Sequence, residues 1–94
     1  MTNPSICIPR TTLDVDEQLV RRIFNKYKLG PIKRIDIVHN TQYGNKRIFI
    51  HFKYWFDNQK NLDIKEKLLN GESINIIYAK PWFWKCSVSK IPKP

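Results

Sequence analysis

Cysteine, glycine and long apolar runs are all scarce in this chain of 94 residues. Cys7 and Cys86 are the only cysteines, which is too few for a disulfide scaffold, and they lack the paired spacing of zinc ligands. No apolar stretch approaches the roughly 20 residues that a membrane-spanning helix needs, and no apolar leader follows Met1. We therefore expect an intracellular protein of a reducing compartment, with no membrane segment, metal or cofactor.

The sequence also lacks the patterns that are typical of enzymes. Its three glycines all stand in predicted turns, which excludes a glycine-rich phosphate loop. We find no Ser/His/Asp pattern of a hydrolase and no paired carboxylates in apolar surroundings. Residues 8–12 lack the glycine of an acylphosphatase-like anion cradle. We accordingly expect no catalytic residues and no small-molecule substrate.

Positive charge is the most distinctive feature of the composition. Seventeen Lys and Arg residues stand against eight Asp and Glu residues, which gives a formal net charge of +9. Hydrophobic residues make up 41% of the chain, enough for one small packed core. A field of this strength favours anionic partners such as phosphates, although net charge also serves solubility alone.

The spacing of apolar residues predicts four strands and two helices in the order βαββαβ. Alternation is clearest where Ile48, Ile50 and Phe52 interleave with polar or aromatic residues. Asp14 or Asp16 is expected to cap the first helix, and Gly30-Pro31 to end it. The predicted elements are a strand at 5–9, a helix with apolar positions from Val15 to Tyr27, strands at 32–39 and 46–54, a helix at 58–69 and a strand at 73–79.

This order predicts an α+β fold of the ferredoxin-like class. In that fold, two helices cover one face of a four-stranded antiparallel sheet and leave the other face open, and the last strand lies beside the first. We divide the chain into an N-terminal arm at 1–4, a domain at 5–79 and a Trp-rich, basic extension at 80–94 with a frayed end. In the linker after the third strand, Trp55 or Phe56 is expected to pack beneath the second helix.

One predicted strand carries a motif-like pattern. Asn45-Lys46-Arg47-Ile48-Phe49-Ile50-His51-Phe52 aligns with K/R-G-F/Y-G/A-F-V-x-F/Y, the third-strand pattern of the RNA-recognition motif. Residues 5–79 resemble that family, with helix 19–27 and the turn at 69–76 also similar. Three motif positions differ, because Lys46, Arg47 and Ile48 replace the glycine, the first aromatic residue and the small residue. In the first strand, Cys7 stands where the family usually has a stacking ring.

The resemblance implies a non-enzymatic module that binds single-stranded RNA more readily than DNA on the open face of its sheet. Such domains stack bases on exposed rings, and here Phe49 is the ring expected to remain. Binding would then depend on charge and show weak sequence selectivity. His51 is expected to face solvent or nucleic acid. The predicted nucleic-acid-binding residues are Arg34, Lys46, Arg47, Phe49, His51, Lys53 and Asn75.

The chain is also similar to small RNA-recognition-like proteins of large DNA viruses. An abundance of Ile, Lys and Asn, typical of A/T-rich coding sequences, agrees with that source. A viral source would place the protein in the virion or in the infected host cell.

A second hypothesis assigns the fold to protein contact, with a homodimer as one form. Trp82, Phe83 and Trp84 together form more aromatic surface than an exposed tail usually carries. They are expected to fold back over the sheet, to dock into another chain, or to form an auxiliary platform for base stacking beside Lys80 and Lys85. The predicted protein-interface residues are Cys7, Ile77, Trp82, Phe83 and Trp84.

Overall fold

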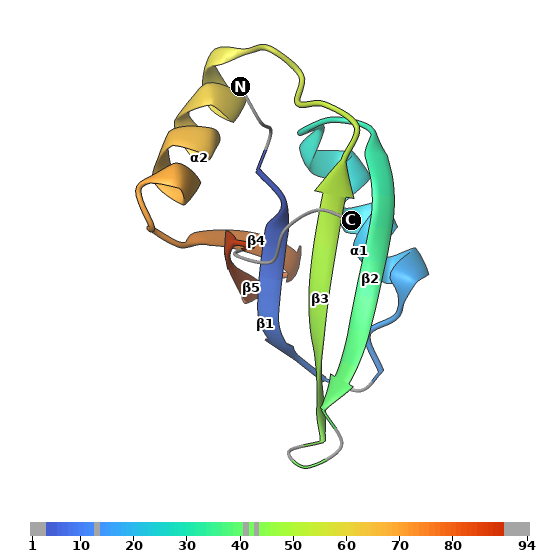
Figure 1. Cartoon of the computed structure of the whole chain (residues 1–94). Helices are drawn as coiled ribbons and strands as arrows, with labels where there is room; N and C mark the ends of the chain where they lie inside the picture. The colour runs from blue at the N-terminus through green and yellow to red at the C-terminus, as the bar shows by residue number, and fades with distance from the viewer. Residues whose placement is uncertain (1–3, 13, 41, 43, 90–94) are drawn as a thin grey trace.

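The computed structural model describes residues 4–12, 14–40, 42 and 44–89. It confirms an α+β fold with two helices and an antiparallel sheet. Residues 1–3 of the arm predicted at 1–4, and residues 90–94 of the extension predicted at 80–94, lie outside the described residues. The elements, labelled in Figure 1, are β1 (Ile6–Thr11), α1 (Glu17–Tyr27), β2 (Ile32–Asn40), β3 (Asn45–Phe52), α2 (Gln59–Leu69), β4 (Ile74–Ala79) and β5 (Trp82–Val88).

The strand count and strand order differ from the four-stranded ferredoxin-like prediction. The sheet has five strands in the order β2-β3-β1-β5-β4, so β5 lies beside β1 and β4 forms an edge. The β1–β5 ladder contains only two residue pairs, Ile6–Val88 and Cys7–Ser87. Because this junction is short, the β4–β5 hairpin can turn away from β1, and Figure 1 shows it crossing at a large angle.

The fifth strand forms in the segment that was expected to be an extension beyond the sheet. Its side chains alternate, so that Trp84 and Cys86 enter the core while Phe83 and Lys85 remain exposed. The Trp84 ring stacks on Phe24 of α1 at 6.5 Å and on Tyr78 of β4 at 4.7 Å between centroids. Burial of this large ring explains why the segment joins the sheet.

The core lies between the helices and one face of the sheet. Ile48, Ile50 and Phe52 point into it from β3, as their alternation predicts, and α1 contributes Val20, Ile23 and Phe24. In Figure 1, α1 lies behind β2 and β3, while α2 lies on the other side of β1. The opposite face of the sheet is called the outer face below.

Local signals account for both ends of α1. Of the two candidate caps, Asp16 is the one that acts, since its carboxylate accepts a hydrogen bond from Leu19 N at 2.9 Å. The helix ends at Tyr27, and the next residue, Lys28, adopts the left-handed conformation at φ 54°. Gly30, which was predicted to end the helix, instead lies against the main chain of another segment. A Cβ atom there would lie 2.0 Å from the Tyr54 carbonyl oxygen, so glycine permits the close approach of two main-chain segments.

The strand predicted at 46–54 ends earlier, at Phe52. Beyond it the main chain pairs with the segment after α1, because Lys53 N donates to Pro31 O and Phe56 N donates to Leu29 O. Trp55 is buried in the core and its indole donates to Pro4 O at 3.1 Å, whereas Phe56 stays largely exposed. Neither α1 nor α2 has the length and apolar character needed to cross a membrane, and no other helix occurs among the described residues.

Candidate nucleic-acid interface

The outer face divides into a central part on β1, β2 and β3 and a peripheral part on the β4–β5 hairpin. In the centre, register places Cys7 beside Phe49 and Phe49 beside Asp36. Arg34 lies opposite His51, and Val38 lies opposite Arg47. Of the predicted β3 residues, Arg47, Phe49 and His51 therefore share the outer face, as the alternation implies.

Phe49 does not offer the exposed ring that was expected at the centre of this face. The residue is only 6% exposed, although it lies outside the core cluster on the helix side of the sheet. A base stacks on a ring only where the ring surface is accessible. In this conformation Phe49 therefore stabilises the outer face and presents little surface to a ligand.

His51 also differs from its expected solvent-facing position. It is 4% exposed, and its two ring nitrogens each have a partner. Nδ1 lies 2.8 Å from Ser5 Oγ, and Nε2 lies 3.0 Å from Asp36 Oδ2. Because a carboxylate only accepts, Nε2 donates to Asp36, and Nδ1 is left to pair with the Ser5 hydroxyl, which can either donate or accept. The network therefore links Ser5, the residue before β1, to His51 of β3 and Asp36 of β2.

Ser5, His51 and Asp36 thus form a Ser–His–Asp chain that the sequence did not reveal. In a hydrolase the serine oxygen must reach substrate. Here Ser5 is 5% exposed, while the carboxylate at the other end of the chain is half-exposed and also pairs with Arg34 at 2.9 Å. A nucleophilic serine must be the accessible member of such a chain, whereas here Ser5 is the buried member and Asp36 is the accessible one. The arrangement therefore fits a structural cross-link better than an acyl-transfer site.

The four predicted basic residues of the centre lie in different surroundings. Arg47 is exposed on the outer face, and Arg34 is exposed there but held by Asp36. Lys46 points to the helix side, where its amine donates to Val15 O at 2.7 Å. Lys53 is exposed just beyond the end of β3. Of these four residues, Arg34 and Arg47 are consequently the cations that the central part of the outer face displays.

The β4–β5 hairpin carries the accessible ring that the centre lacks. Ile77 pairs with Phe83 across the two strands, and Asn75 pairs with Lys85 beside them. Phe83 is 50% exposed, and Ile77, Asn75 and Lys85 are exposed as well. Residues two apart on one strand point to the same face about 7 Å from each other. Phe83 and Lys85 therefore place a ring and an ammonium group on one surface.

Contacts on the opposite side of the hairpin hold this surface in place. The Tyr27 hydroxyl accepts a hydrogen bond from Ile77 N at 2.8 Å, which ties the edge of β4 to α1. Trp84 lies between Phe24 and Tyr78, so the hairpin is also fixed by stacked rings. Trp84 is thus a core residue, whereas Trp82 at the start of β5 is 65% exposed.

Charge is distributed unequally between the helical segments and the strands of the sheet. Segments 12–28 and 56–73, which contain the helices, carry seven basic and seven acidic residues. The remaining described segments carry eight basic residues and a single acid, Asp36. The positive excess therefore belongs to the sheet and its connections. The eight basic residues are Arg10, Lys33, Arg34, Lys46, Arg47, Lys53, Lys80 and Lys85.

The two cysteines are free and lie on opposite faces of the sheet. Cys86 is in the core, where burial, with a smaller contribution from Cys7, raises the pKa of its thiol to about 12. Burial also raises the pKa of the Cys7 thiol, although the nearby Arg47 guanidinium opposes that shift. Within the described part of the chain, no three His, Cys, Asp or Glu side chains are grouped so as to hold a metal ion.

Sequence reasoning missed Ser5, Tyr27 and the pairing of Lys85 with Asn75. Only the pairing of the folded strands brings these groups to their partners. The pairing of β5 could not be predicted, because its segment was expected to lie outside the sheet. No family model, curated protein or solved structure matches the chain. The resemblance to the RNA-recognition motif therefore remains a prediction from the quoted residues.

Proposed function

We propose that the protein is a non-enzymatic module that binds single-stranded nucleic acid, with affinity dominated by charge. The observation that carries the proposal is the unequal charge of the two layers. The sheet strands and their connections carry eight basic residues, of which Lys46 points to the helix side, against the single acid Asp36, while the helical segments are balanced. A surface of one sign attracts polyanions through release of their counterions. The preference for RNA over DNA rests on the family resemblance alone.

Base stacking is assigned to Phe83 of the hairpin instead of Phe49. An accessible ring beside an ammonium group on one surface matches what a nucleotide offers, a planar base and a phosphate. Ile77 extends the apolar surface under such a base, and Asn75 adds hydrogen-bonding groups at its edge. Because every base has a stacking face, this arrangement favours binding with weak sequence selectivity.

Paired charge variants test the proposal. A labelled single-stranded RNA is titrated at low salt against the wild type, against Arg47→Ala/Lys85→Ala on the sheet side, and against Arg22→Ala/Lys67→Ala on the helices. Each pair removes two exposed positive charges, so net charge is matched. The sheet-side pair is expected to weaken binding about tenfold or more, and the helix pair much less. Equal losses, or no binding by the wild type, would contradict the proposal.

The exposed hairpin also supports a second candidate, contact with another protein. Ile77, Trp82 and Phe83 are all largely exposed apolar side chains of one hairpin. If two copies associate through them, the sedimentation coefficient should rise with protein concentration, and Phe83→Ala should abolish the rise. A single species across the concentration range would exclude the homodimer.

A further inference from the structure

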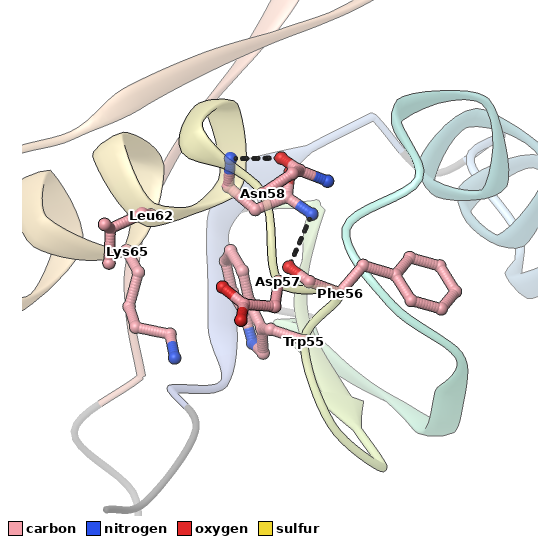
Figure 2. A pocket seen from close by; sticks show the side chains of 7 residues that line it. Trp55, Phe56, Asp57, Asn58, Leu62 and Lys65 are labelled. Atoms are coloured by element: carbon pink, nitrogen blue, oxygen red, sulfur yellow. Dashed lines mark hydrogen bonds between the residues drawn. The ribbon is translucent and has the colours of Figure 1, made fainter.

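Trp82, at the start of β5, is a feature that nucleic-acid binding leaves unexplained. It is 65% exposed, more than any other large apolar side chain that the structure describes. The other two tryptophans are buried. Trp84 lies in the core, and Trp55 lines a small pocket at the start of α2, where Figure 2 shows it beside Asp57. Trp82 is therefore the one tryptophan ring that the protein presents to solvent.

The apolar surface around Trp82 lies on both faces of the β4–β5 hairpin. Trp82 and Phe83 are neighbours on β5, and successive residues of a strand point to opposite faces. Phe83 is exposed on the outer face, where Ile77 pairs with it, and Trp82 is exposed on the face that also carries Trp84. The turn at 80–81 with the side chains of Ile77, Trp82 and Phe83 is called the hairpin tip below.

A nucleic-acid base cannot cover the whole hairpin tip. A base stacked on Phe83 occupies the outer face and leaves Trp82 exposed on the other face. A partner that covers both rings must surround the tip. The interfacial region of a lipid bilayer does so, because it is fluid and is not limited to one face of a strand pair.

The charge of the hairpin fits a negatively charged surface. Residues 73–89 contain Lys80 and Lys85 and no Asp or Glu. Both lysines are exposed, Lys80 in the turn and Lys85 on the outer face. A lysine beside apolar surface can bury its methylene chain there while its ammonium group reaches the headgroups. Anionic lipids attract basic segments near the bilayer surface, so charge and apolar area act at the same place.

The hairpin tip stands on a rigid base. Trp84 stacks on rings from α1 and β4, and Ile77 N donates to the Tyr27 hydroxyl at 2.8 Å. Strand pairing extends to Ala79 and Trp82, which flank the turn. The exposed rings are thus already positioned, and little ordering is required when they bind.

We propose that the hairpin tip inserts into the surface of a bilayer that contains anionic lipid. Trp82 and Phe83 would lie at the boundary between headgroups and acyl chains, with Lys80 and Lys85 against the lipid phosphates. Tryptophan suits this zone because its ring has an apolar body and one polar N–H group. Peripheral segments insert only about 5–10 Å, so no membrane-spanning element is required. The proposal goes beyond the proposed function and does not depend on it.

Sedimentation with vesicles, in the absence of nucleic acid, tests the proposal. The full chain is mixed at low salt with vesicles of phosphatidylcholine alone, or of phosphatidylcholine with about a quarter phosphatidylserine. Affinity for the phosphatidylserine vesicles should be about tenfold higher or more. Equal affinities, or no binding to the phosphatidylserine vesicles, would overturn the proposal. Neither result would change the outcome of the RNA titration, so the two functions fail independently.

A variant without the exposed ring separates insertion from attraction by charge. A protein of net charge +9 is drawn to anionic vesicles in any case, so the variant must keep that charge. Trp82→Ala does so, and it should lower vesicle affinity about tenfold. Leu69→Ala is the control, since Leu69 is 55% exposed near the end of α2 and its loss should change affinity by less than about twofold. Equal affinities of Trp82→Ala and the wild type would overturn the proposal.

Tryptophan fluorescence identifies the ring that enters the bilayer. Phosphatidylserine vesicles should shift the emission of the wild type to shorter wavelength, and brominated acyl chains should quench it. Both effects should be absent in Trp82→Ala, in which the buried Trp55 and Trp84 still emit. If the shift persists in Trp82→Ala, the inserted ring lies elsewhere. If it arises without lipid as protein concentration rises, a second copy covers the tip. Either result would overturn the proposal.

Discussion

The Nε2 atom of His51 lies 3.0 Å from Asp36 Oδ2, across the ladder that joins β3 to β2. The other oxygen of the same carboxylate, Oδ1, lies 2.9 Å from Arg34 Nε. The other ring nitrogen of His51, Nδ1, contacts the Ser5 hydroxyl. A buried polar group is stable only when it is fully paired. The centre of the outer face is therefore a cross-linked structure, and the accessible ring lies on the hairpin instead.

Replacing His51 with alanine should lower the free energy of unfolding by about 1–3 kcal/mol, because the buried Ser5 hydroxyl loses its partner. Urea denaturation measures the change. His39→Ala on β2 is the matched control, since His39 is exposed and should change stability by less than about 0.5 kcal/mol. Similar small effects for the two histidines would contradict the assignment of a buried network.

Trp84→Ala should destabilise the fold by about 3–5 kcal/mol, since it removes the ring between Phe24 and Tyr78. Trp82→Ala, two residues earlier in β5, should have little effect because that ring is mostly exposed. Thermal unfolding of the two variants distinguishes them. If Trp84→Ala unfolds like the wild type, then β5 is not part of the packed sheet.

The two rings of the outer face should respond differently to removal. Phe83→Ala is expected to reduce affinity for single-stranded RNA by roughly tenfold with stability unchanged, as for the loss of one stacked base. Phe49→Ala should instead lower stability, because that side chain is buried. Affinity by fluorescence anisotropy and stability by urea denaturation separate these effects. A loss of affinity only for folded Phe49→Ala would restore the central face as the stacking site.

The two thiols should differ in their reaction with iodoacetamide at pH 8. The thiolate is the reactive form, and with a pKa of about 12 only about one part in ten thousand of Cys86 is ionised. Cys7 is half-buried and lies on the outer face, so it should react first. Peptide mass mapping after timed labelling measures the order. Equal rates in the folded protein would mean that Cys86 is not enclosed in the core.

Local sequence patterns predicted most of the elements. Ile48, Ile50 and Phe52 alternate as a half-buried strand requires, and Asp16 stands where a helix cap is needed. The alternation that buries Trp84 and Cys86 is also present in the sequence. The βαββαβ order nevertheless completes a four-stranded sheet without this segment, so the element order alone does not predict a fifth strand.

The candidate site was less predictable because it depends on distant pairings. Ser5 and His51 lie 46 residues apart, so only the folded register brings them together. Alternation assigned Phe49 to the correct face of β3 but could not give its exposure, which depends on what surrounds that face. The role of Phe83 likewise depends on the pairing of β4 with β5.

The salt dependence of RNA binding tests the central claim most directly. Affinity for a single-stranded oligonucleotide should be measured between about 50 and 200 mM salt. If the sheet side engages about four phosphates, the logarithm of the binding constant should fall with a slope near −3, a loss of about 50-fold over this range. Arg47→Ala/Lys85→Ala should make the slope shallower by about one to two, and Arg22→Ala/Lys67→Ala should leave it unchanged. A wild-type affinity that is independent of salt would contradict the account.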